Sequence, residues 1–316
     1  MLVSSILVTG GAGFIGSRFV NRLINKQFSN LNINRVMVLD SLTYAGDLNR
    51  ISNNLSNPNF TFIKGDIRDR SLISDLINRV DGVINFAAET HVDRSITSPV
   101  EFIQTNVMGF ANLLALANEY KKRILQISTD EVYGSILEGC ASEDQPLNPS
   151  SPYSASKAAA DLLALSFYKT FGTDIVITRC SNNYGPNQFP EKIIPLFIKI
   201  LSEGGNVPIY GDGQNRRDWI HVDDHCDGIA LAYSHGLAGN IYNIGDNQEF
   251  TNLEITKIIL NELKLDLDRI DFVEDRKGHD FRYAVDSKKI RDGLGWERKK
   301  DFREEISELV NSYKKS

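Results

Sequence analysis

A glycine-rich turn near the N-terminus constrains the fold more than any other feature of this sequence. The apolar run Ile6-Leu7-Val8-Thr9 leads directly into glycines at positions 10, 11, 13 and 16. This pattern predicts a strand, a tight turn and a helix. Gly10 would permit the turn, Gly13 would let a pyrophosphate approach the backbone, and Gly16 would allow the helix to pack closely on the strand. The N–H groups at the start of such a helix attract phosphate charge, so we expect a dinucleotide-binding unit.

An acidic residue follows the second strand-like run, Val36-Met37-Val38-Leu39. Asp40 lies near the offset at which a carboxylate binds the ribose 2′-hydroxyl of a dinucleotide, and no arginine replaces it to bind a 2′-phosphate. The sequence therefore predicts NAD rather than NADP as the cofactor. The alternative is a glycine turn with a capping aspartate, but strand, spacing and acid together favour the cofactor site.

Further strand-like runs alternate with helical stretches. They cover residues 60–63, 82–86, 123–127 and 174–178, with a return to the sheet near 241–244. This alternation predicts an α/β fold with a Rossmann-type, doubly wound parallel sheet and a smaller C-terminal substrate-binding lobe. We expect an NAD-binding domain over 1–180 with a returning segment near 218–247, interleaved with a second lobe over 181–316. The loops that follow the strands should converge on one crevice.

Tyr153 and Lys157 are four residues apart and would share one face of a helix. There the ammonium can lower the pKa of the phenol, and the phenolate can take a proton from a sugar hydroxyl while a nicotinamide takes the hydride. The spacing alone is a weak signal, because a solvated helix face can carry the same pair. The glycine turn and the upstream run Thr129-Asp130-Glu131 favour the catalytic interpretation.

Composition excludes several other classes of protein. The chain has 316 residues, 41% of them hydrophobic, which is enough for a large core and two lobes. Its formal net charge of −6 argues against nucleic acid as a partner. We see no apolar run of membrane-spanning length and no basic start typical of a signal peptide, so we expect a cytoplasmic protein that does not enter the membrane.

Neither the cysteines nor the histidines have the spacing of a metal site. Cys140, Cys180 and Cys226 are scattered, which suits a reducing compartment. His221 and His225 are four apart, but Val222 stands where a zinc-protease helix needs glutamate. We therefore predict no metal, and we expect Asp223 to cap a helix that starts there.

Several longer motifs carry a family resemblance that covers nearly the whole chain. They are Ala87-Ala88-Glu89-Thr90-His91-Val92-Asp93-Arg94-Ser95, Thr129-Asp130-Glu131-Val132-Tyr133-Gly134, Asn182-Asn183-Tyr184-Gly185-Pro186, Pro190-Glu191-Lys192, Gly211-Asp212-Gly213 and Arg217-Asp218-Trp219. With the glycine turn and the Tyr-Lys pair, they make the chain similar to the extended short-chain dehydrogenase/reductase superfamily. Within it, the chain resembles the dTDP-glucose 4,6-dehydratases, which implies a lyase acting in deoxysugar synthesis, such as that of rhamnose.

The resemblance implies a role for the adjacent acids Asp130 and Glu131. Oxidation at C4 of the glucose acidifies the proton at C5, which Glu131 can remove while a protonated Asp130 donates to the departing C6 hydroxyl. The hydride then returns to C6, giving the 4-keto-6-deoxy sugar nucleotide and water. Thr129, Tyr153 and Lys157 complete the expected catalytic set.

The resemblance also implies two sets of binding residues. Those expected at NAD are Gly10, Gly13, Phe14, Ile15, Gly16, Asp40, Ser41, Leu42, Thr43, Asp66, Ile67, Phe86, Ala87, Ala88, Thr105, Tyr153, Lys157 and Asn183. Those expected at the nucleotide sugar are Thr90, Thr129, Asn182, Lys192, Ile193, Pro208, Ile209, Tyr210, Arg217, Asn252, Asp275, Arg276 and His279. Arg217 would clamp the pyrophosphate, because a guanidinium donates two parallel hydrogen bonds to phosphate oxygens.

Three departures from the family pattern leave alternatives open. Thr90 stands where many relatives have serine, Lys277 where proline is usual, and the loop between Glu131 and Tyr153 is short. Thymine differs from uracil by one methyl group, worth only about 1–3 kcal/mol in an apolar pocket, so UDP-glucose stays an alternative to dTDP-glucose. An NAD-dependent sugar-nucleotide epimerase and a non-catalytic NAD-binding sensor are the rival functions.

We also expect a homodimer. The segments 102–120 and 153–170 are helix-prone and apolar on one face. In the families that the chain resembles, the equivalent helices pair across a two-fold axis as a four-helix bundle.

Overall fold

A seven-stranded parallel sheet forms the centre of the molecule in the computed structural model, which describes residues 4–275 and 278–313. The strand order is β10-β6-β5-β4-β1-β2-β3, and all six neighbouring pairs run parallel. Its strands are β1 (Ser5–Thr9), β2 (Arg35–Asp40), β3 (Phe60–Lys64), β4 (Gly82–Asn85), β5 (Arg123–Thr129), β6 (Ile175–Cys180) and β10 (Ile241–Ile244). The predicted fold class is confirmed.

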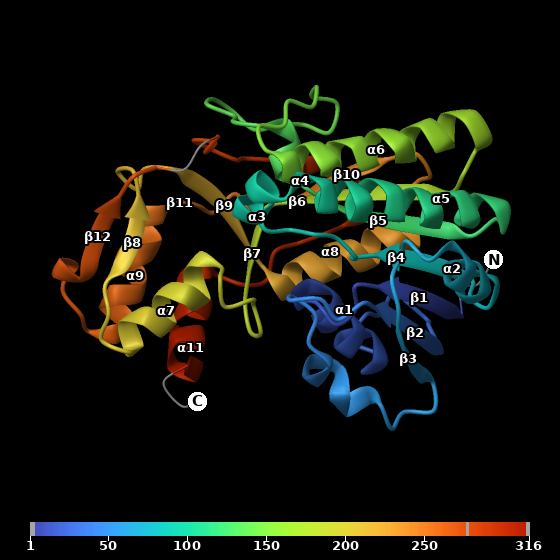
Figure 1. Ribbon diagram of the computed structural model, residues 1–316, viewed down its shortest axis with the longest axis horizontal. Helices are drawn as coiled ribbons and strands as arrows, with labels where there is room; N and C mark the ends of the chain where they lie inside the picture. Colours follow the sequence, from blue (N-terminus) through green and yellow to red (C-terminus); the bar gives the residue numbers. More distant parts are fainter. Residues whose placement is uncertain (1–3, 276–277, 314–316) are drawn as a thin grey trace.

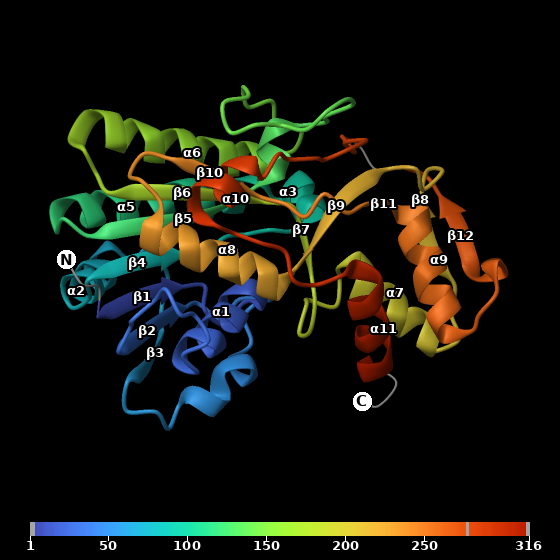
Figure 2. The same ribbon diagram turned by 180° about the vertical axis from the view of Figure 1, so that it is seen from behind.

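Helices cover both faces of this sheet (Figures 1 and 2). One face packs against α1 (Phe14–Ile24), α8 (Val222–His235) and α10 (Lys288–Leu294), and the other against α2 (Arg70–Asn78), α5 (Phe110–Glu119) and α6 (Pro152–Phe171). Alternate residues of a strand enter the two cores: Ile6 and Val8 face the first, and Leu7 faces the second. This double burial explains why the strands read as continuous apolar runs.

The helix α6 carries Tyr153 and Lys157, and its ends are well defined by sequence. Ser151 caps it in a capping box with Ser154, Pro152 occupies the first turn, and Gly172 ends it with a φ of +67°. Each of these residues has the conformational preference that its position requires. The first turn of α6 is thereby fixed close to the end of β5.

A continuous helix runs beside α6 from Pro99 to Glu119 and comprises α4 (Pro99–Phe102), the π-helical η2 (Ile103–Gly109) and α5. By length and composition alone it could cross a membrane, so the expectation that no run reaches that length was wrong. Of its most apolar window, 44% is buried inside the structure. Core helices of water-soluble proteins pass the same test, so this feature alone does not indicate a membrane.

The second lobe has a core of its own, on the left in Figure 1. Two small sheets, with strand orders β11-β9-β7 and β12-β8, pack with three helices. Their elements are β7 (Asn182–Tyr184), β8 (Val207–Tyr210), β9 (Arg216–His221), β11 (Glu249–Thr251), β12 (Ile270–Val273), α7 (Ile193–Ser202), α9 (Asn252–Leu263) and α11 (Phe302–Tyr313). Shorter helices elsewhere are α3 (Val92–Thr97), η1 (Leu48–Asn54), η3 (Asp130–Tyr133) and η4 (Leu267–Arg269).

The start of α8 corrects one prediction. His221, not Asp223, is the N-cap, and its Nδ1 accepts a hydrogen bond from the backbone N–H of Asp223 at 3.2 Å. The Asp223 carboxylate instead pairs with Arg18 of α1 at 2.5 Å. The Asp223 side chain, which the sequence predicted as the cap, is therefore used in an ion pair with a distant segment instead.

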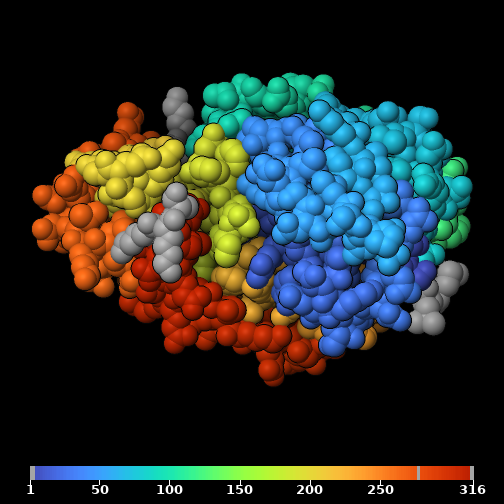
Figure 3. All heavy atoms as spheres, turned by 90° about the horizontal axis from the view of Figure 1, so that it is seen from below, coloured from blue at the N-terminus to red at the C-terminus, as the bar shows by residue number. Residues whose placement is uncertain are grey.

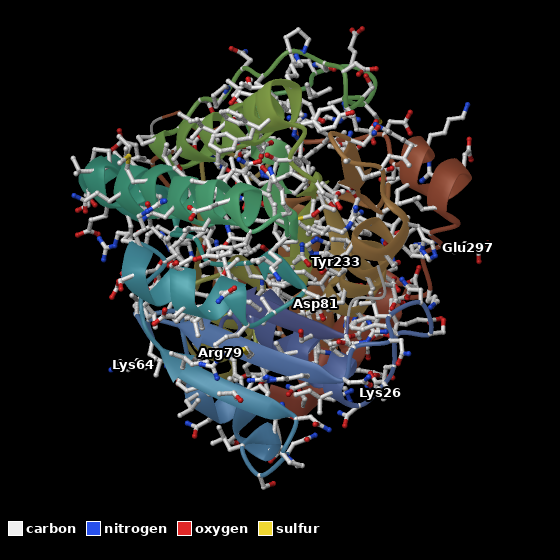
Figure 4. The ribbon with its side chains drawn as sticks, turned by 90° about the vertical axis from the view of Figure 1, so that its right-hand side faces the viewer. Lys26, Lys64, Arg79, Asp81, Tyr233 and Glu297 are labelled. Atoms are coloured by element: carbon white, nitrogen blue, oxygen red, sulfur yellow. The ribbon has the colours of Figure 1, made fainter. Side chains whose placement is uncertain are left out.

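At the amino ends of the central strands, Asp81 binds the residues at the start of β1. Figure 4 views the molecule from the side on which β1 begins and labels Asp81 and Tyr233 there. Asp81 Oδ2 accepts hydrogen bonds from the backbone N–H and the hydroxyl of both Ser4 and Ser5, at 2.8–3.0 Å. The site is formed instead by the loops at the carboxyl ends of the strands, on the opposite side of the sheet.

Candidate active site

A cavity of about 350 Å³ lies at the carboxyl ends of the central strands. This volume is within the range of small-molecule and cofactor sites, and the position is where ligands bind in open α/β sheets. The predicted residues that line it are Gly10, Gly13, Phe14, Ile15, Gly16, Asp40, Ser41, Thr43, Asp66, Ile67, Phe86, Ala87, Ala88, Thr90, Thr105, Thr129, Asp130, Glu131, Tyr153, Lys157, Asn182, Asn183, Lys192 and Ile193. The cavity thus brings together nearly all of the expected cofactor residues, the expected catalytic residues and five of the expected substrate residues, Thr90, Thr129, Asn182, Lys192 and Ile193.

The glycine turn leaves backbone exposed to this cavity. Gly10 has a φ of +70°, and a Cβ there would approach the backbone nitrogen of Ala87 to 2.5 Å. A Cβ on Gly16 would overlap the carbonyl oxygen of Gly10. Side chains are therefore excluded where β1 turns into α1, and Gly13 caps that helix at the cavity wall. A helix N-terminus bare of side chains is suited to a pyrophosphate.

Asp40 holds the glycine turn in place. Its Oδ2 accepts a hydrogen bond from the backbone N–H of Ala12 at 2.9 Å, and its Oδ1 accepts one from Leu42 at 2.8 Å. Each carboxylate oxygen can accept more than one hydrogen bond, so the residue can do so and still bind a ribose hydroxyl. Leu42 itself packs against the core beneath α1 and is the one predicted cofactor residue that does not line the cavity.

Tyr153 and Lys157 are both buried in the first turns of α6, at 7% and 4% exposure. Lys157 Nζ donates a hydrogen bond to the carbonyl oxygen of Ile127 at 2.6 Å, and the Tyr153 ring packs edge-on against Phe102. Burial lowers the pKa of Lys157, and Asp161 opposes that shift. Burial, and then the charge of Glu131, raise the pKa of Tyr153 well above its ordinary value. The expected lowering of the phenol pKa by Lys157 is not among its main influences here.

The acidic pair follows β5 directly. Thr129 caps η3 by accepting a hydrogen bond from the backbone N–H of Glu131, and its hydroxyl donates to Asp130 Oδ1 at 3.2 Å. Asp130 is only 2% exposed, whereas Glu131 is partly exposed. Burial, the charge of Glu131 and the charge of Asp218 raise the pKa of Asp130 well above its ordinary value. A buried acid whose pKa is raised therefore lies next to a second carboxyl group.

Other predicted substrate residues lie beyond the cavity lining. Tyr210 and His279 contact edge to face, with ring centroids 6.2 Å apart, and His279 pairs with Asp275 at 2.6 Å. Ile209 is buried in the core of the second lobe, while Pro208 and Asn252 lie at β8 and at the start of α9. Arg276 lies outside the described residues. The cluster of Tyr210, Asp275 and His279 is separate from the cavity lining.

Arg217 lies between these two regions. Its guanidinium stacks on the Tyr283 ring at 4.3 Å and donates hydrogen bonds to the carbonyl oxygens of Arg216, Asp280 and Phe281 at 2.7–3.2 Å. Its charge also acts to lower the pKa of Asp130. The predicted phosphate clamp is thus held by the backbone of the segment that follows His279.

The cavity wall also contains residues that were not among the predicted site residues: Leu39, Ala45, Gly46, Gly65, Arg68, Glu89, Ile127, Ser128, Cys180, Ser181, Gln188, Phe189 and Trp219. Most follow or end a strand of the central sheet. Gly65, Glu89, Ser128, Cys180 and Ser181 belong to the loops that were expected to converge on one crevice, and they line it. Phe189 and Gln188 had no such signal, because they approach from the loop before α7.

Contacts across the cavity connect that loop to the cofactor side. Arg94 Nη2 pairs with Glu191 at 2.7 Å and its guanidinium lies 3.8 Å from the Tyr44 ring centroid. Tyr44 in turn packs edge-on against Phe189, with centroids 5.5 Å apart. Figure 3 shows the segment after β7, in yellow-green, against the N-terminal residues in blue. The loop before α7 therefore borders the entrance of the cavity.

Within residues 4–275 and 278–313, no group of three or more His, Cys, Asp and Glu side chains could hold a metal ion. The buried ionisable side chains of the cavity include Asp130, Tyr153 and Lys157. These groups suit proton transfer at an organic substrate.

Comparison with known proteins agrees with this chemistry. The family described as GDP-mannose 4,6 dehydratase matches residues 7–309. A dTDP-glucose 4,6-dehydratase of Actinoplanes sp. is 51% identical over 98% of this chain and 97% of its own length. The crystal structure of the dTDP-glucose 4,6-dehydratase DesIV from Streptomyces venezuelae, with NAD and TYD bound, is 48% identical, with a TM-score of 0.97 over 99% of this chain and 97% of that one.

Proteins of much lower sequence identity also share this fold. A UDP-glucose 4-epimerase from Thermotoga maritima, solved with UDP-glucose, has a TM-score of 0.89 at 28% identity, covering 98% of this chain and 99% of that chain. Backbone similarity alone thus does not separate a dehydratase from an epimerase, but the identity to the two dehydratases above, 51% and 48%, is well above the 28% to this epimerase. On the extent of that match and on the identity to its relatives, the chain belongs to the GDP-mannose 4,6 dehydratase family of short-chain dehydrogenase/reductase enzymes.

Proposed function

We propose that this enzyme is an NAD-dependent nucleoside-diphosphate-glucose 4,6-dehydratase that converts dTDP-glucose to dTDP-4-keto-6-deoxyglucose and water. The observation that carries the proposal is the placing of Asp130 and Glu131 in one cavity with Tyr153 and Lys157. The relatives named dTDP-glucose 4,6-dehydratase, at up to 51% identity, support it. Deoxysugar synthesis, for example that of rhamnose, is the proposed setting.

The chain's own residues divide the proton transfers among them. Tyr153 takes the proton of the C4 hydroxyl, beside the charge of Lys157, and the hydroxyl of Thr129 acts to lower the phenol pKa. Glu131 removes the proton from C5. Asp130, whose raised pKa favours its protonated form, donates to the hydroxyl that leaves C6. Two adjacent acids in different environments can hold these opposite roles.

NAD is the proposed resident cofactor, because the cavity wall suits its parts. The α1 N-terminus with its glycines would hold the pyrophosphate, Asp40 the ribose, and Asp66 and Ile67 the adenine end. When bound, NAD would supply the oxidation at C4 and the return of the hydride to C6. Tyr153 and Lys157 line the same cavity, so the reacting end must lie beside them.

The nucleotide of the substrate is a finer proposal. Thr90, Asn182, Lys192 and Ile193 line the cavity and would hold the sugar and phosphates, with Arg217 at the pyrophosphate. The cluster of Tyr210, Asp275 and His279 would hold the base. UDP-glucose remains the alternative substrate, since one methyl group separates the two bases.

An epimerase is the second candidate function, and the acid pair argues against it. Epimerisation at C4 needs the Tyr-Lys pair but has no use for a base at C5. A non-catalytic NAD-binding sensor would need none of the four catalytic side chains. Incubation with dTDP-glucose and, separately, UDP-glucose decides among them. Loss of one water by mass and a 4-keto product support the dehydratase, an unchanged mass with inverted C4 supports the epimerase, and no reaction supports the sensor.

We further propose a cytoplasmic homodimer with the two interleaved domains predicted above. Val100, Ile103 and Met108 of the long helix and Leu162 of α6 are 51–61% exposed, although all are apolar. The two helices contact each other, so these side chains can form one apolar surface that a second copy would cover as a four-helix bundle. The three cysteines are unpaired, which suits the cytoplasm.

A further inference from the structure

A buried ion pair lies one helical turn beyond Lys157. Tyr153, Lys157 and Asp161 follow each other at intervals of four residues and so share one face of α6. Asp161 is fully buried, and its Oδ2 accepts a hydrogen bond from Arg179 Nε of β6 at 2.9 Å. Arg179 is itself only 1% exposed.

The pair belongs to a polar row that crosses three strands. Ser128 of β5 is the register partner of Arg179, and Arg179 is the partner of Asn243 on β10. Ser128 Oγ donates to Asp161 Oδ2 at 3.0 Å, Arg179 Nη1 donates to the Tyr133 hydroxyl at 2.8 Å, and that hydroxyl donates to Asn243 Oδ1 at 2.8 Å. The row therefore connects α6 and η3, the two elements that carry the catalytic side chains.

Stability alone gives no reason for this arrangement. Replacing a buried ion pair by packed apolar side chains is often neutral or stabilising, because the desolvation of both charges opposes their attraction. The nearest charged side chain on the same helix face is Lys157, whose ammonium is buried against one carbonyl oxygen. An isolated buried ammonium tends to lose its proton.

The charged and titratable groups around Lys157 are few. Its own helix contributes Tyr153 and Asp161, β6 contributes Arg179 and Cys180, and η3 contributes Asp130, Glu131 and Tyr133. From the long helix, the side chains that meet α6 here are the uncharged Phe102 and Asn106. Among the influences on Lys157, Asp161 is the largest that favours its charged form. Arg179 is hydrogen-bonded to the same carboxylate.

We propose that Asp161 is a positioning residue for the reaction, which keeps Lys157 charged beside Tyr153, and that Arg179 limits how strongly it does so. This role rests on the proposed function of the Tyr-Lys pair. The charge on Asp161 acts on Lys157 and, through it, on the phenol, while neither Asp161 nor Arg179 lines the cavity. The balance of the two buried charges would set the pH range in which Tyr153 can act as a base.

The test is the pH profile of kcat/KM in variants that change one charge. Asp161→Asn removes the charge that favours the ammonium, so the Lys157 pKa should fall and the alkaline limb of the bell should move to lower pH by about one unit or more. Because a neutral Lys157 no longer favours the phenolate, the Tyr153 pKa should rise, and the bell should narrow from both sides. Arg179→Gln removes the positive charge that opposes Asp161 and should move the alkaline limb to higher pH. The double variant restores the balance and should return the profile close to that of the wild type.

Tyr133→Phe is the matched control, because it removes the hydrogen bond to Arg179 without changing charge. Its profile should stay in place, even if its stability falls. If Asp161→Asn and Arg179→Gln instead lower the rate by one factor at every pH, the role is merely structural and the proposal is overturned. If one of the two single variants fails to fold, the pH profile of the other is sufficient for the test. If neither folds, a displaced profile in the double variant overturns the proposal.

A readout without turnover separates this proposal from the proposed function. The ultraviolet absorbance of the phenolate, taken as the difference between each protein and the same protein with Tyr153→Phe, reports the ionisation of Tyr153 directly. Its midpoint should rise in Asp161→Asn, where Lys157 loses its charge more readily, and should not rise in Arg179→Gln. An unmoved midpoint refutes the role of Asp161, whereas a moved midpoint in a protein that fails to dehydrate dTDP-glucose refutes only the proposed substrate.

Discussion

Asp130 and Glu131 are adjacent in the chain, but only Asp130 is sealed from solvent. Thr129 caps η3, which begins at Asp130, and within this short helix Asp130 is buried while Glu131 remains partly exposed. Burial raises the pKa of Asp130, and the charge of Glu131 raises it further. One backbone turn thus places a proton donor and a carboxylate on neighbouring residues.

Changing Glu131 to glutamine should separate oxidation from elimination. The variant lacks the C5 base but keeps Tyr153 and Lys157, so oxidation at C4 should continue while water loss slows by roughly 10²–10⁴-fold. Enzyme-bound NADH should then accumulate on addition of dTDP-glucose, which its absorbance reports. Tyr153→Phe is the control, and it should show no such signal. Rapid dehydration without accumulated NADH in Glu131→Gln would assign the C5 base to another residue.

Changing Asp130 to asparagine should stabilise the fold at alkaline pH. Because folding raises the pKa of Asp130, the protonated carboxyl favours the folded state. This stabilisation is fully present below the ordinary pKa of about 3.9 and is lost as pH rises through the raised pKa of the folded protein. Asparagine cannot ionise. The gain in free energy of unfolding should therefore be larger at about pH 8 than at about pH 5 in denaturant titrations. Glu138→Gln, at an exposed carboxyl outside the cavity lining, is the control, and an equal gain at both values in Asp130→Asn would contradict the burial argument.

Changing Gly10 to alanine should remove the cofactor. Its φ of +70° and the closeness of Ala87 leave no room for a Cβ, so the turn must open. NAD should copurify with the wild type and be absent or strongly reduced in Gly10→Ala, as measured after denaturing the protein. Gly139→Ala is a matched control, because Gly139 also has a positive φ, of +68°, but no atom within 4 Å of a Cβ. Loss of NAD from both variants would point to general unfolding.

The parts of this fold that could be predicted from sequence are those encoded within one short stretch. The glycine turn, the strands of the central sheet and the Tyr-Lys spacing each need only neighbouring residues, and the structure places them as expected. The cap of α8 was mistaken for a physical reason. His221 and Asp223 can both cap, and Arg18 decides between them through an ion pair from a helix about 200 positions away in the chain.

The pairing of Asp161 with Arg179 was likewise hidden from sequence. It depends on the register of β5, β6 and β10, which brings Ser128, Arg179 and Asn243 into one row. The stacking of Arg217 on Tyr283 depends on a similar meeting of distant segments. Sequence indicated the type of side chain at each catalytic position, and the tertiary contacts determine how each is held.

Charged substitutions on the exposed helix surface should yield a monomer. Met108 is 60% exposed on the long helix and Leu162 is 58% exposed on α6. Met108→Glu with Leu162→Glu would place four like charges in a two-fold interface, which desolvation makes costly. Light scattering at micromolar concentration should show a dimer for the wild type and a monomer for the double variant. Leu237→Glu, at a 68% exposed apolar residue outside these helices, should leave the dimer intact. A monomeric wild type would contradict the proposed bundle.

The contacts of Arg94 should keep the hydride within one catalytic cycle. Arg94 stacks on Tyr44 and pairs with Glu191, and Tyr44 packs on Phe189, so three linked contacts join the loop before α7 to the cofactor side of the cavity. A substrate deuterated at C4 should deliver its label to C6 of the same sugar molecule. Mixing it with a ¹³C-labelled, undeuterated substrate tests this by mass. Deuterium in the ¹³C product would mean that the hydride passed from one sugar molecule to another. Arg94→Ala cuts two of the contacts and should raise such crossover, together with the NADH found free in solution. Lys169→Ala removes an exposed cation in the last turn of α6, at the opposite end of that helix from Tyr153, and should leave the label where the wild type puts it. Crossover as frequent in the wild type as in Arg94→Ala would show that the cofactor leaves between the two hydride transfers, and that these contacts do not retain it.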